Sequence, residues 1–154
     1  MAGFKAQIAD ALKSRVEGVT IAGGYSHDIG VVSFDKVKIN ISDYQDFELP
    51  AVQIIDLSAT VNHEMSRSRT QWFLAVEICM RTTEELGVVD QKELWDLEES
   101  VKRAIMEDPK LGLNYVTSVT LIDSVTDLHM LDPNYISTIG VQVEYYEPIT
   151  RSAC

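Results

Sequence analysis

The sequence predicts a single-domain α+β protein, in which a mainly antiparallel β-sheet of four or five strands packs against two helices. Two stretches carry apolar residues at helical spacing, and four have the alternating, β-branched pattern of strands. The strand-like stretches come as two consecutive pairs, and consecutive strands usually lie side by side. At 154 residues, 45% of them hydrophobic, the chain is long enough to bury roughly two-thirds of its unfolded surface as one domain over residues 1–154.

The first helix is predicted from an apolar residue at every fourth position between Phe4 and Val16. This spacing places the apolar side chains on one helix face, with charged residues around them. Gly18 follows the last of them, and glycine commonly ends helices. We therefore expect a helix over about residues 3–17.

The stretch from Gly23 to Leu49 has a weaker pattern. A short alternation that ends at Ile41 is followed by the polar run SDYQDFE. One strand with a long loop fits this composition, and so does an extended arm without a sheet partner. The sequence leaves both alternatives open.

The first strand pair consists of LPAVQIIDLSATV, about residues 49–61, and TQWFLAVEICMRT, about residues 70–82. Between them, NHEMSRSR has the composition of a long hairpin connection. In the second strand, the even-numbered residues from Trp72 to Met80 are apolar and predict one face in the core. The other face is too apolar for free solvation and too polar for a second core, and it carries Gln71, Phe73, Ala75, Glu77, Cys79 and Arg81.

The second helix is predicted to begin after Asp90, which can form a capping box with Glu93. Pro109 is expected to end it. One face is apolar and should pack on the sheet, with Leu94, Leu97, Val101, Ala104 and Ile105. The opposite face should be solvated, with Glu98, Glu99, Lys102 and Arg103.

The second strand pair consists of VTSVTLIDSVTDL, about residues 116–128, and YISTIGVQVEYYE, about residues 135–147, joined by HMLDPN. In the last strand, the odd-numbered residues from Ile139 to Tyr145 alternate with glycine and polar or aromatic residues. This alternation again predicts one core face and one different face.

The charge of the chain bears on its partners. The formal net charge is −11, with 24 acidic against 13 basic side chains, which argues against a groove that neutralises phosphates. Sequence-specific DNA binding is therefore not expected, although an acidic surface can line a passage through which DNA slides. No segment approaches the roughly 18 consecutive apolar residues of a membrane span, so we expect a soluble protein.

The sequence contains no recognisable constellation for catalysis, metal binding or cofactor binding. The histidines His27, His63 and His129 fall in predicted loops and are expected to be solvated, and they lack metal-ligand spacing. GxSxG and phosphate-loop motifs are also missing. Cys79 is expected to be a small buried hydrophobe and Cys154 an unpaired thiol. We therefore expect no enzyme and no cofactor.

A set of arginine and aromatic residues is instead a candidate interface. Arginines bracket the second strand, and because a hairpin tip projects from a domain they could pair with carboxylates of a neighbouring chain. A solubilising turn explains the same arginines equally well. Aromatic residues on the second faces favour the interface, since aromatics and arginine are enriched at interface centres. The expected subunit or partner interface comprises Arg67, Arg69, Phe73, Glu77, Arg81 and Tyr146.

The order of these elements resembles that of tail terminator proteins of long-tailed bacteriophages. The shared layout is an amphipathic N-terminal helix, an irregular polar stretch, a strand opening LPAV at Leu49, an arginine-flanked second strand, the helix from Leu94 to Ile105 and a closing strand ending VQVEYY at Tyr146. The resemblance covers nearly the whole chain and lies in this layout. No family residue can be carried over as functional, because no motif position matches.

The resemblance implies a compact subunit whose antiparallel sheet packs against helices. Such subunits assemble as a ring, typically six-fold, at the head-proximal end of the tail tube. The ring ends tube polymerisation and offers a docking face to the head and neck. Expected partners are other copies of the chain, the tail tube protein, a sheath protein and neck or connector proteins, with DNA only passing through the lumen. The expected location is the virion, after synthesis in the cytoplasm of a bacterial host.

Two other classes fit the sequence. One is a different neck or head-tail connector component, such as a head-completion protein. The other is a small cellular α+β binding module or enzyme whose site comes from loop residues such as His27, Asp28 and His129.

Overall fold

The computed structural model describes residues 3–34, 45, 48–81, 91–127 and 134–148. Its elements are, in chain order, α1 (Phe4–Glu17), β1 (Val31–Ser33), β2 (Ala51–Glu64), β3 (Arg67–Arg81), α2 (Gln91–Met106), β4 (Val116–Asp127) and β5 (Asn134–Pro148). The strands form one sheet in the order β1-β2-β3-β5-β4. Only β1 is parallel to its neighbour, and the other pairings are antiparallel. The predicted α+β fold is confirmed.

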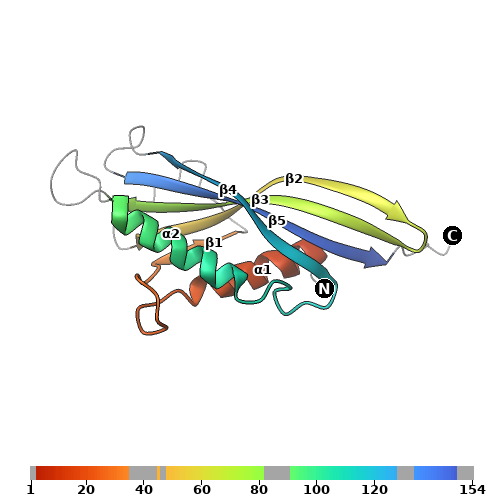
Figure 1. Ribbon diagram of the computed structural model, residues 1–154, viewed down its shortest axis with the longest axis horizontal. Coiled ribbons are helices and arrows are strands. Elements are labelled where there is room, and N and C mark those ends of the chain that lie inside the picture. The colour runs from red at the N-terminus through yellow and green to blue at the C-terminus, as the bar shows by residue number, and fades with distance from the viewer. Residues whose placement is uncertain (1–2, 35–44, 46–47, 82–90, 128–133, 149–154) are drawn as a thin grey trace.

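Both helices lie on the same side of the sheet (Figure 1), and we call the sheet surface that they cover the helix face. The apolar stripe of α1 is buried there, including Leu12 and Val16, and so is the apolar face of α2, including Leu97. They pack in one core with the predicted alternation of β3 from Trp72 to Met80. Burial of such aliphatic side chains contributes about 1.5–3 kcal/mol each. The helix face therefore supplies most of the apolar burial of this subunit.

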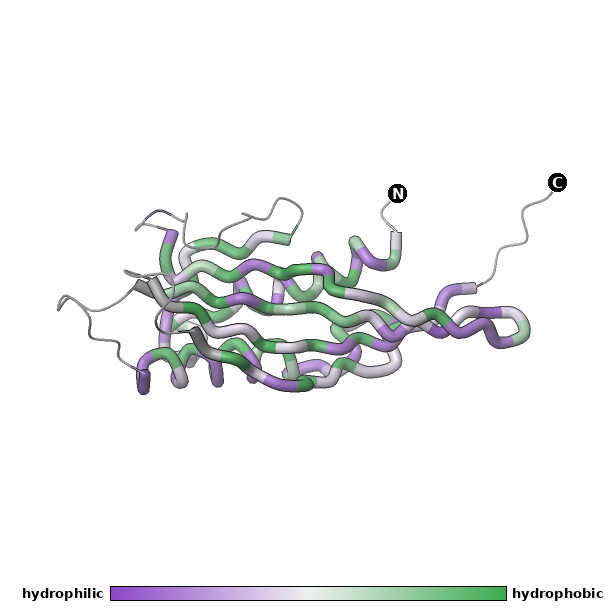
Figure 2. The backbone as a smooth tube through the Cα atoms, turned by 90° about the horizontal axis from the view of Figure 1, so that it is seen from above, coloured by the Kyte–Doolittle hydropathy of each residue, from purple (hydrophilic) through white to green (hydrophobic). Residues whose placement is uncertain are grey.

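In the hairpin between β2 and β3, the strands are longer and the turn is shorter than predicted. The strands pair as far as Glu64 with Arg67, so only Met65 and Ser66 form the turn. NHEMSRSR is mostly strand, although its composition is that of a loop. The hairpin projects beyond the helices (Figures 1 and 2), where most of its residues are exposed and apolar alternation is not required.

Between Gly23 and Leu49, the sequence left open whether the chain forms a strand of the sheet or an extended arm, and the structure shows a short strand. Val31–Ser33 form a short strand parallel to β2, with Val31 opposite Ala51. A Cβ atom on Gly30 would collide with the backbone of Glu48, so glycine permits the close approach of these segments. The later alternation that ends at Ile41 lies outside the described residues, as does the predicted helix cap Asp90.

Glu98 was expected on the solvated face of α2, and this prediction was wrong. Its residue exposure is only 7%, because α2 lies against the sheet at this point. Lys102 Nζ lies 2.8 Å from one carboxylate oxygen of Glu98, and the Ser137 hydroxyl donates to the other at 3.1 Å. Burial acts to raise the pKa of Glu98, but hydrogen bonds from Lys102, Ser124 and Ser137 outweigh it and hold the pKa below its usual value.

This arrangement predicts an acid-dependent loss of stability. Because the folded pKa of Glu98 is depressed below 4.5, its ionised form stabilises the fold above that pH, and this stabilisation is lost as the pH falls through the folded pKa. The unfolding free energy of wild type should exceed that of Glu98→Gln at neutral pH, and the difference should shrink below pH 4.5. Urea melts across the acid range measure this difference.

The exposed neighbour Glu99 provides the matched control. Glu99→Gln should change the unfolding free energy by about 0.5 kcal/mol or less. A difference between wild type and Glu98→Gln that stays constant from neutral to acid pH would contradict the stabilising role of the ionised carboxylate.

Candidate functional site

The sheet surface opposite the helices is not uniform along β3. At one end, Ala51, Cys79 and Ile136 form a small second core, with Val31 and Leu49 packed against it. Burial raises the pKa of the Cys79 thiol to about 12, and the charge of Glu77 adds to the rise. The thiol is therefore held in its unreactive protonated form, as expected for a buried hydrophobe.

Most of the odd-numbered residues of β3 between Cys79 and the hairpin are more exposed than Cys79. Ala75 is only 6% exposed, whereas Glu77, Phe73 and Gln71 are all half-buried. Phe73 lies between Ser58 of β2 and Gln142 of β5. We define the open face as the surface formed by Gln71, Phe73, Glu77, Gln142, Glu144 and Tyr146. No described helix covers it (Figure 1).

At the hairpin end of the open face, three predicted interface residues lie together. The Arg67 guanidinium stacks 3.9 Å from the centre of the Tyr146 ring. Nε of Arg69 lies 3.8 Å from a Glu64 oxygen and 4.0 Å from a Glu144 oxygen, distances too long for hydrogen bonds. This Nε is buried and has no hydrogen-bond partner among the described residues. The arginines thus meet carboxylates of their own chain.

The remaining predicted interface residues do not join this cluster. Phe73 is four residues along β3 from Arg69, and Glu77 four further, so each step spans about 13 Å. Arg69, Phe73 and Glu77 occupy odd-numbered positions of β3, so their side chains lie on the same face of the sheet. The backbone of Arg81 pairs with Asn134, but its side chain lies outside the described residues. The predicted set is thus a line along the sheet.

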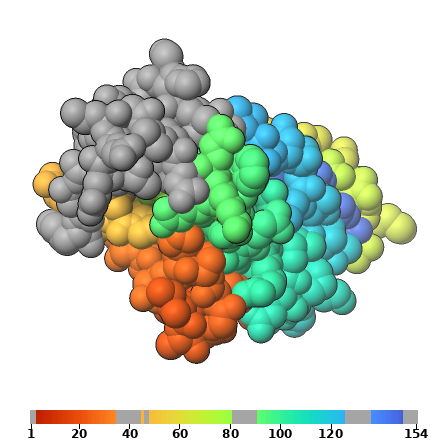
Figure 3. Space-filling view, turned by 60° about the vertical axis from the view of Figure 1, so that its left-hand side comes forward, coloured from red at the N-terminus to blue at the C-terminus, as the bar shows by residue number. Residues whose placement is uncertain are grey.

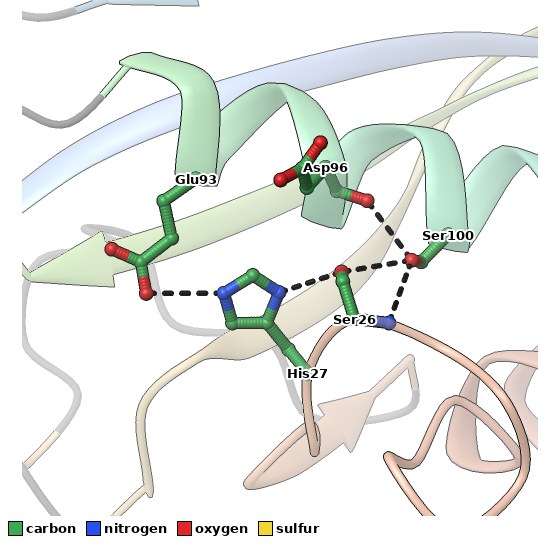
Figure 4. Close-up of polar contacts among 5 residues, drawn as sticks. All are labelled: Ser26, His27, Glu93, Asp96 and Ser100. Carbon is green, nitrogen blue, oxygen red and sulfur yellow. Dashed lines mark hydrogen bonds and ion pairs between the residues drawn. The ribbon is translucent and has the colours of Figure 1, made fainter.

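A second cluster of polar side chains, which the sequence did not reveal, connects α2 with the loop that follows α1 (Figure 4). The Ser26 hydroxyl lies 2.7 Å from His27 Nδ1, and His27 Nε2 lies 3.1 Å from a Glu93 oxygen. The Ser26 hydroxyl also lies 3.0 Å from the Ser100 hydroxyl, which donates to the carbonyl of Asp96 at 2.9 Å. The contacts join residues 66 and 74 positions apart, which no local pattern reveals.

These contacts correct the expectation of solvated loop histidines. The His27 side chain is only 17% exposed. His63 is exposed, but it lies in β2 rather than in a loop, and His129 lies outside the described residues. Arg103 adds a further tie, because it donates to the carbonyl of Gly24 at 2.8 Å and lies over the Tyr25 ring.

The order of Ser26, His27 and Glu93 has the connectivity of a hydrolase triad, but its protons are arranged differently. The Ser100 hydroxyl donates to the Asp96 carbonyl, which leaves the Ser26 hydroxyl as the possible donor in its contact with Ser100. All contacts then form together only if both His27 ring nitrogens carry protons and donate to Ser26 and Glu93. In that state the imidazole cannot accept a proton from Ser26.

The backbone around Ser26 is also occupied. Its N–H donates to the Ser100 hydroxyl at 3.3 Å, so it is not free to stabilise an oxyanion. An open hollow of about 610 Å³ borders Ser26, Ser100 and Arg103. Figure 3 shows the N-terminal part of the chain, in orange, beside α2, in green. The geometry fits a tie that holds the loop against α2.

The comparisons with known proteins add no family. No protein-family model matches the chain, and no curated protein matches it. Within the described part of the chain, no group of three or more His, Cys, Asp or Glu side chains is placed to hold a metal ion. Neither described helix is long and apolar enough to cross a membrane.

Removing the Ser100 hydroxyl should loosen the loop. Ser100→Ala removes the contacts of Ser100 with the N–H and hydroxyl of Ser26. Because Ser26 is exposed, water can replace part of what is lost, and the net cost is about 0.5–1.5 kcal/mol. We expect faster hydrogen exchange of the loop amides near Ser26 and unchanged exchange within α1. Ser14→Ala, at an exposed position of α1, is the control. Loop exchange that is the same in Ser100→Ala as in wild type would show that the tie does not hold the loop.

Proposed function

We propose that this chain is a structural virion protein that forms a ring at the head-proximal end of a phage tail. The ring ends polymerisation of the tail tube and provides the docking face for the head and neck. The layout of the sequence supports this proposal through its resemblance to tail terminator proteins, together with the α+β fold.

The observation that carries the proposal is the uncovered side of the sheet. The two described helices cover only the helix face, and the open face places Phe73 among polar residues. A partly apolar sheet surface of this kind favours association when a partner covers it. Arg67 and Tyr146 extend it along the projecting hairpin with residue types that are common at interface centres.

The charge distribution supports a lumen through which DNA passes without binding. The net charge is −11, and several basic side chains lie in ion pairs with carboxylates of the same chain. Examples are Lys5 with Asp56 and Lys102 with Glu98. Such pairing leaves less positive charge for phosphates, so DNA would not adhere to the ring.

Substitution of Phe73 tests the role of the open face. Phe73→Asp should leave the isolated subunit folded by circular dichroism, because Phe73 lies outside the main core. The same change should abolish rings or their capping of tail tubes in electron micrographs, since a carboxylate would be buried in the contact.

Trp95→Asp provides a matched control, because Trp95 is an aromatic residue that is 55% exposed on α2. This variant should form rings and cap tubes as wild type does. If Phe73→Asp unfolds the isolated subunit, Phe73 belongs to the subunit's own core and the open face is not a docking surface.

A head-completion protein is the nearest alternative, since it would share ring geometry but bind on the head side. Binding of the purified protein to isolated tail tubes favours the terminator, whereas binding to DNA-filled heads alone favours the alternative. The ring itself does not distinguish the two.

A hydrolase is the second candidate function, favoured only by the contacts of Ser26, His27 and Glu93. Because the N–H and the hydroxyl of Ser26 both contact Ser100, we expect a fluorophosphonate probe to leave Ser26 unlabelled, as judged by mass spectrometry. Stoichiometric labelling of wild type that is lost in Ser26→Ala would favour the hydrolase instead.

A further inference from the structure

We propose that neighbouring copies of this chain join edge to edge, with β2 of one copy pairing with β4 of the next. The sheet would then continue from subunit to subunit around the ring. This inference rests on the proposed ring and names the surfaces that form it.

Among the residues that the structure describes, both outer edges of the sheet lack a neighbouring strand over long stretches. The short strand β1 pairs only with residues 51–53 of β2. From Ile54 to Glu64, β2 therefore has no described strand on its outer side. At the opposite edge, β4 is the last strand of the sheet and is 12 residues long. An open edge presents unpaired backbone N–H and C=O groups to another strand.

Neither open stretch carries a lysine or a proline, although each contains acidic residues such as Asp56 and Asp123. Natural edges are commonly guarded by lysine or proline, but residues 54–64 and 116–127 contain no Lys, Arg or Pro. β2 contains one register irregularity, at Leu57, and β4 contains two, at Thr117 and next to Ile122. A bulge bends a strand and increases its twist, which suits a sheet that curves towards closure.

The exposed aliphatic residues gather on the same two strands. Leu57 is 60% exposed and Val61 51% on β2, whereas Ile122 is 50% exposed and Val125 64% on β4. The other large exposed hydrophobic residues in the described part of the chain are Ile21, Met65, Trp95 and Met106. Half of this set thus lies on the two open edges, and pairing of those edges would bury it from both sides.

Strand directions favour a head-to-tail contact. β2, β3, β5 and β4 alternate in direction, so β2 runs antiparallel to β4 within one sheet. Rotation about an axis along the strands preserves these directions, and β4 of the next copy then meets β2 in antiparallel pairing. A symmetric dimer through β2 alone or β4 alone would leave the other edge open. Only the mixed contact covers both edges, and repeated rotation can close it into a ring.

Two lysine double variants test this contact. Leu57→Lys/Val61→Lys blocks the β2 edge, and Ile122→Lys/Val125→Lys blocks the β4 edge. All four positions are exposed in the subunit, so both variants should fold, as circular dichroism can check. In light scattering after size-exclusion chromatography, wild type should form rings and each variant alone should be monomeric.

The mixture of the two variants gives the decisive result. Each variant retains the edge that the other lacks, so an equimolar mixture should form heterodimers and nothing larger. Ile21→Lys/Met106→Lys, which changes exposed residues away from the two edges, should form rings as wild type does.

Several results would overturn the edge contact. Rings that persist in both edge variants would show that the subunits join elsewhere, while the ring function would stand. Loss of assembly in only one variant would point to a symmetric dimer. A wild-type chain that stays monomeric and never caps tail tubes would contradict the ring function itself.

Discussion

The burial of one sheet face by two helices is the constraint on which the rest of this structure depends. Leu12 of α1 and Leu97 of α2 pack against the apolar residues of β3, and this core leaves no described helix for the other side of the sheet. The open face is therefore half-buried rather than solvated. Phe73 and Glu77 are both half-buried on this face. A surface that is neither fully buried nor fully hydrated accommodates both an aromatic and a charged residue.

The features that the sequence predicted are those with a regular apolar period. The alternation from Trp72 to Met80 and the apolar stripe ending at Val16 each required burial on one face, and both lie in the core. The second face of β3 could only be judged by composition. The structure divides it into a buried end at Cys79 and a more exposed end towards Gln71, because neighbouring strands and loops cover only part of it.

The features that were mispredicted depend on contacts distant in sequence. Glu98 lies on α2 where helical spacing indicates solvent, yet Ser137 of β5 meets it at the helix–sheet boundary. His27 is in a loop, but Glu93 and the residues around it hold the loop against α2. The hairpin was missed for a different reason, because strands that project into water need no apolar alternation.

The central claim is that assembly covers the open face and leaves the outer side of the helix layer exposed. Hydroxyl-radical footprinting of the chain, free and bound to tail tubes, tests this most directly, because aromatic side chains report their own solvent exposure. The account predicts that oxidation of Phe73 and Tyr146 falls on binding, while oxidation of Trp95 on α2 is unchanged. Protection of Trp95 with Phe73 and Tyr146 still reactive would contradict it and place the docking surface on the helices.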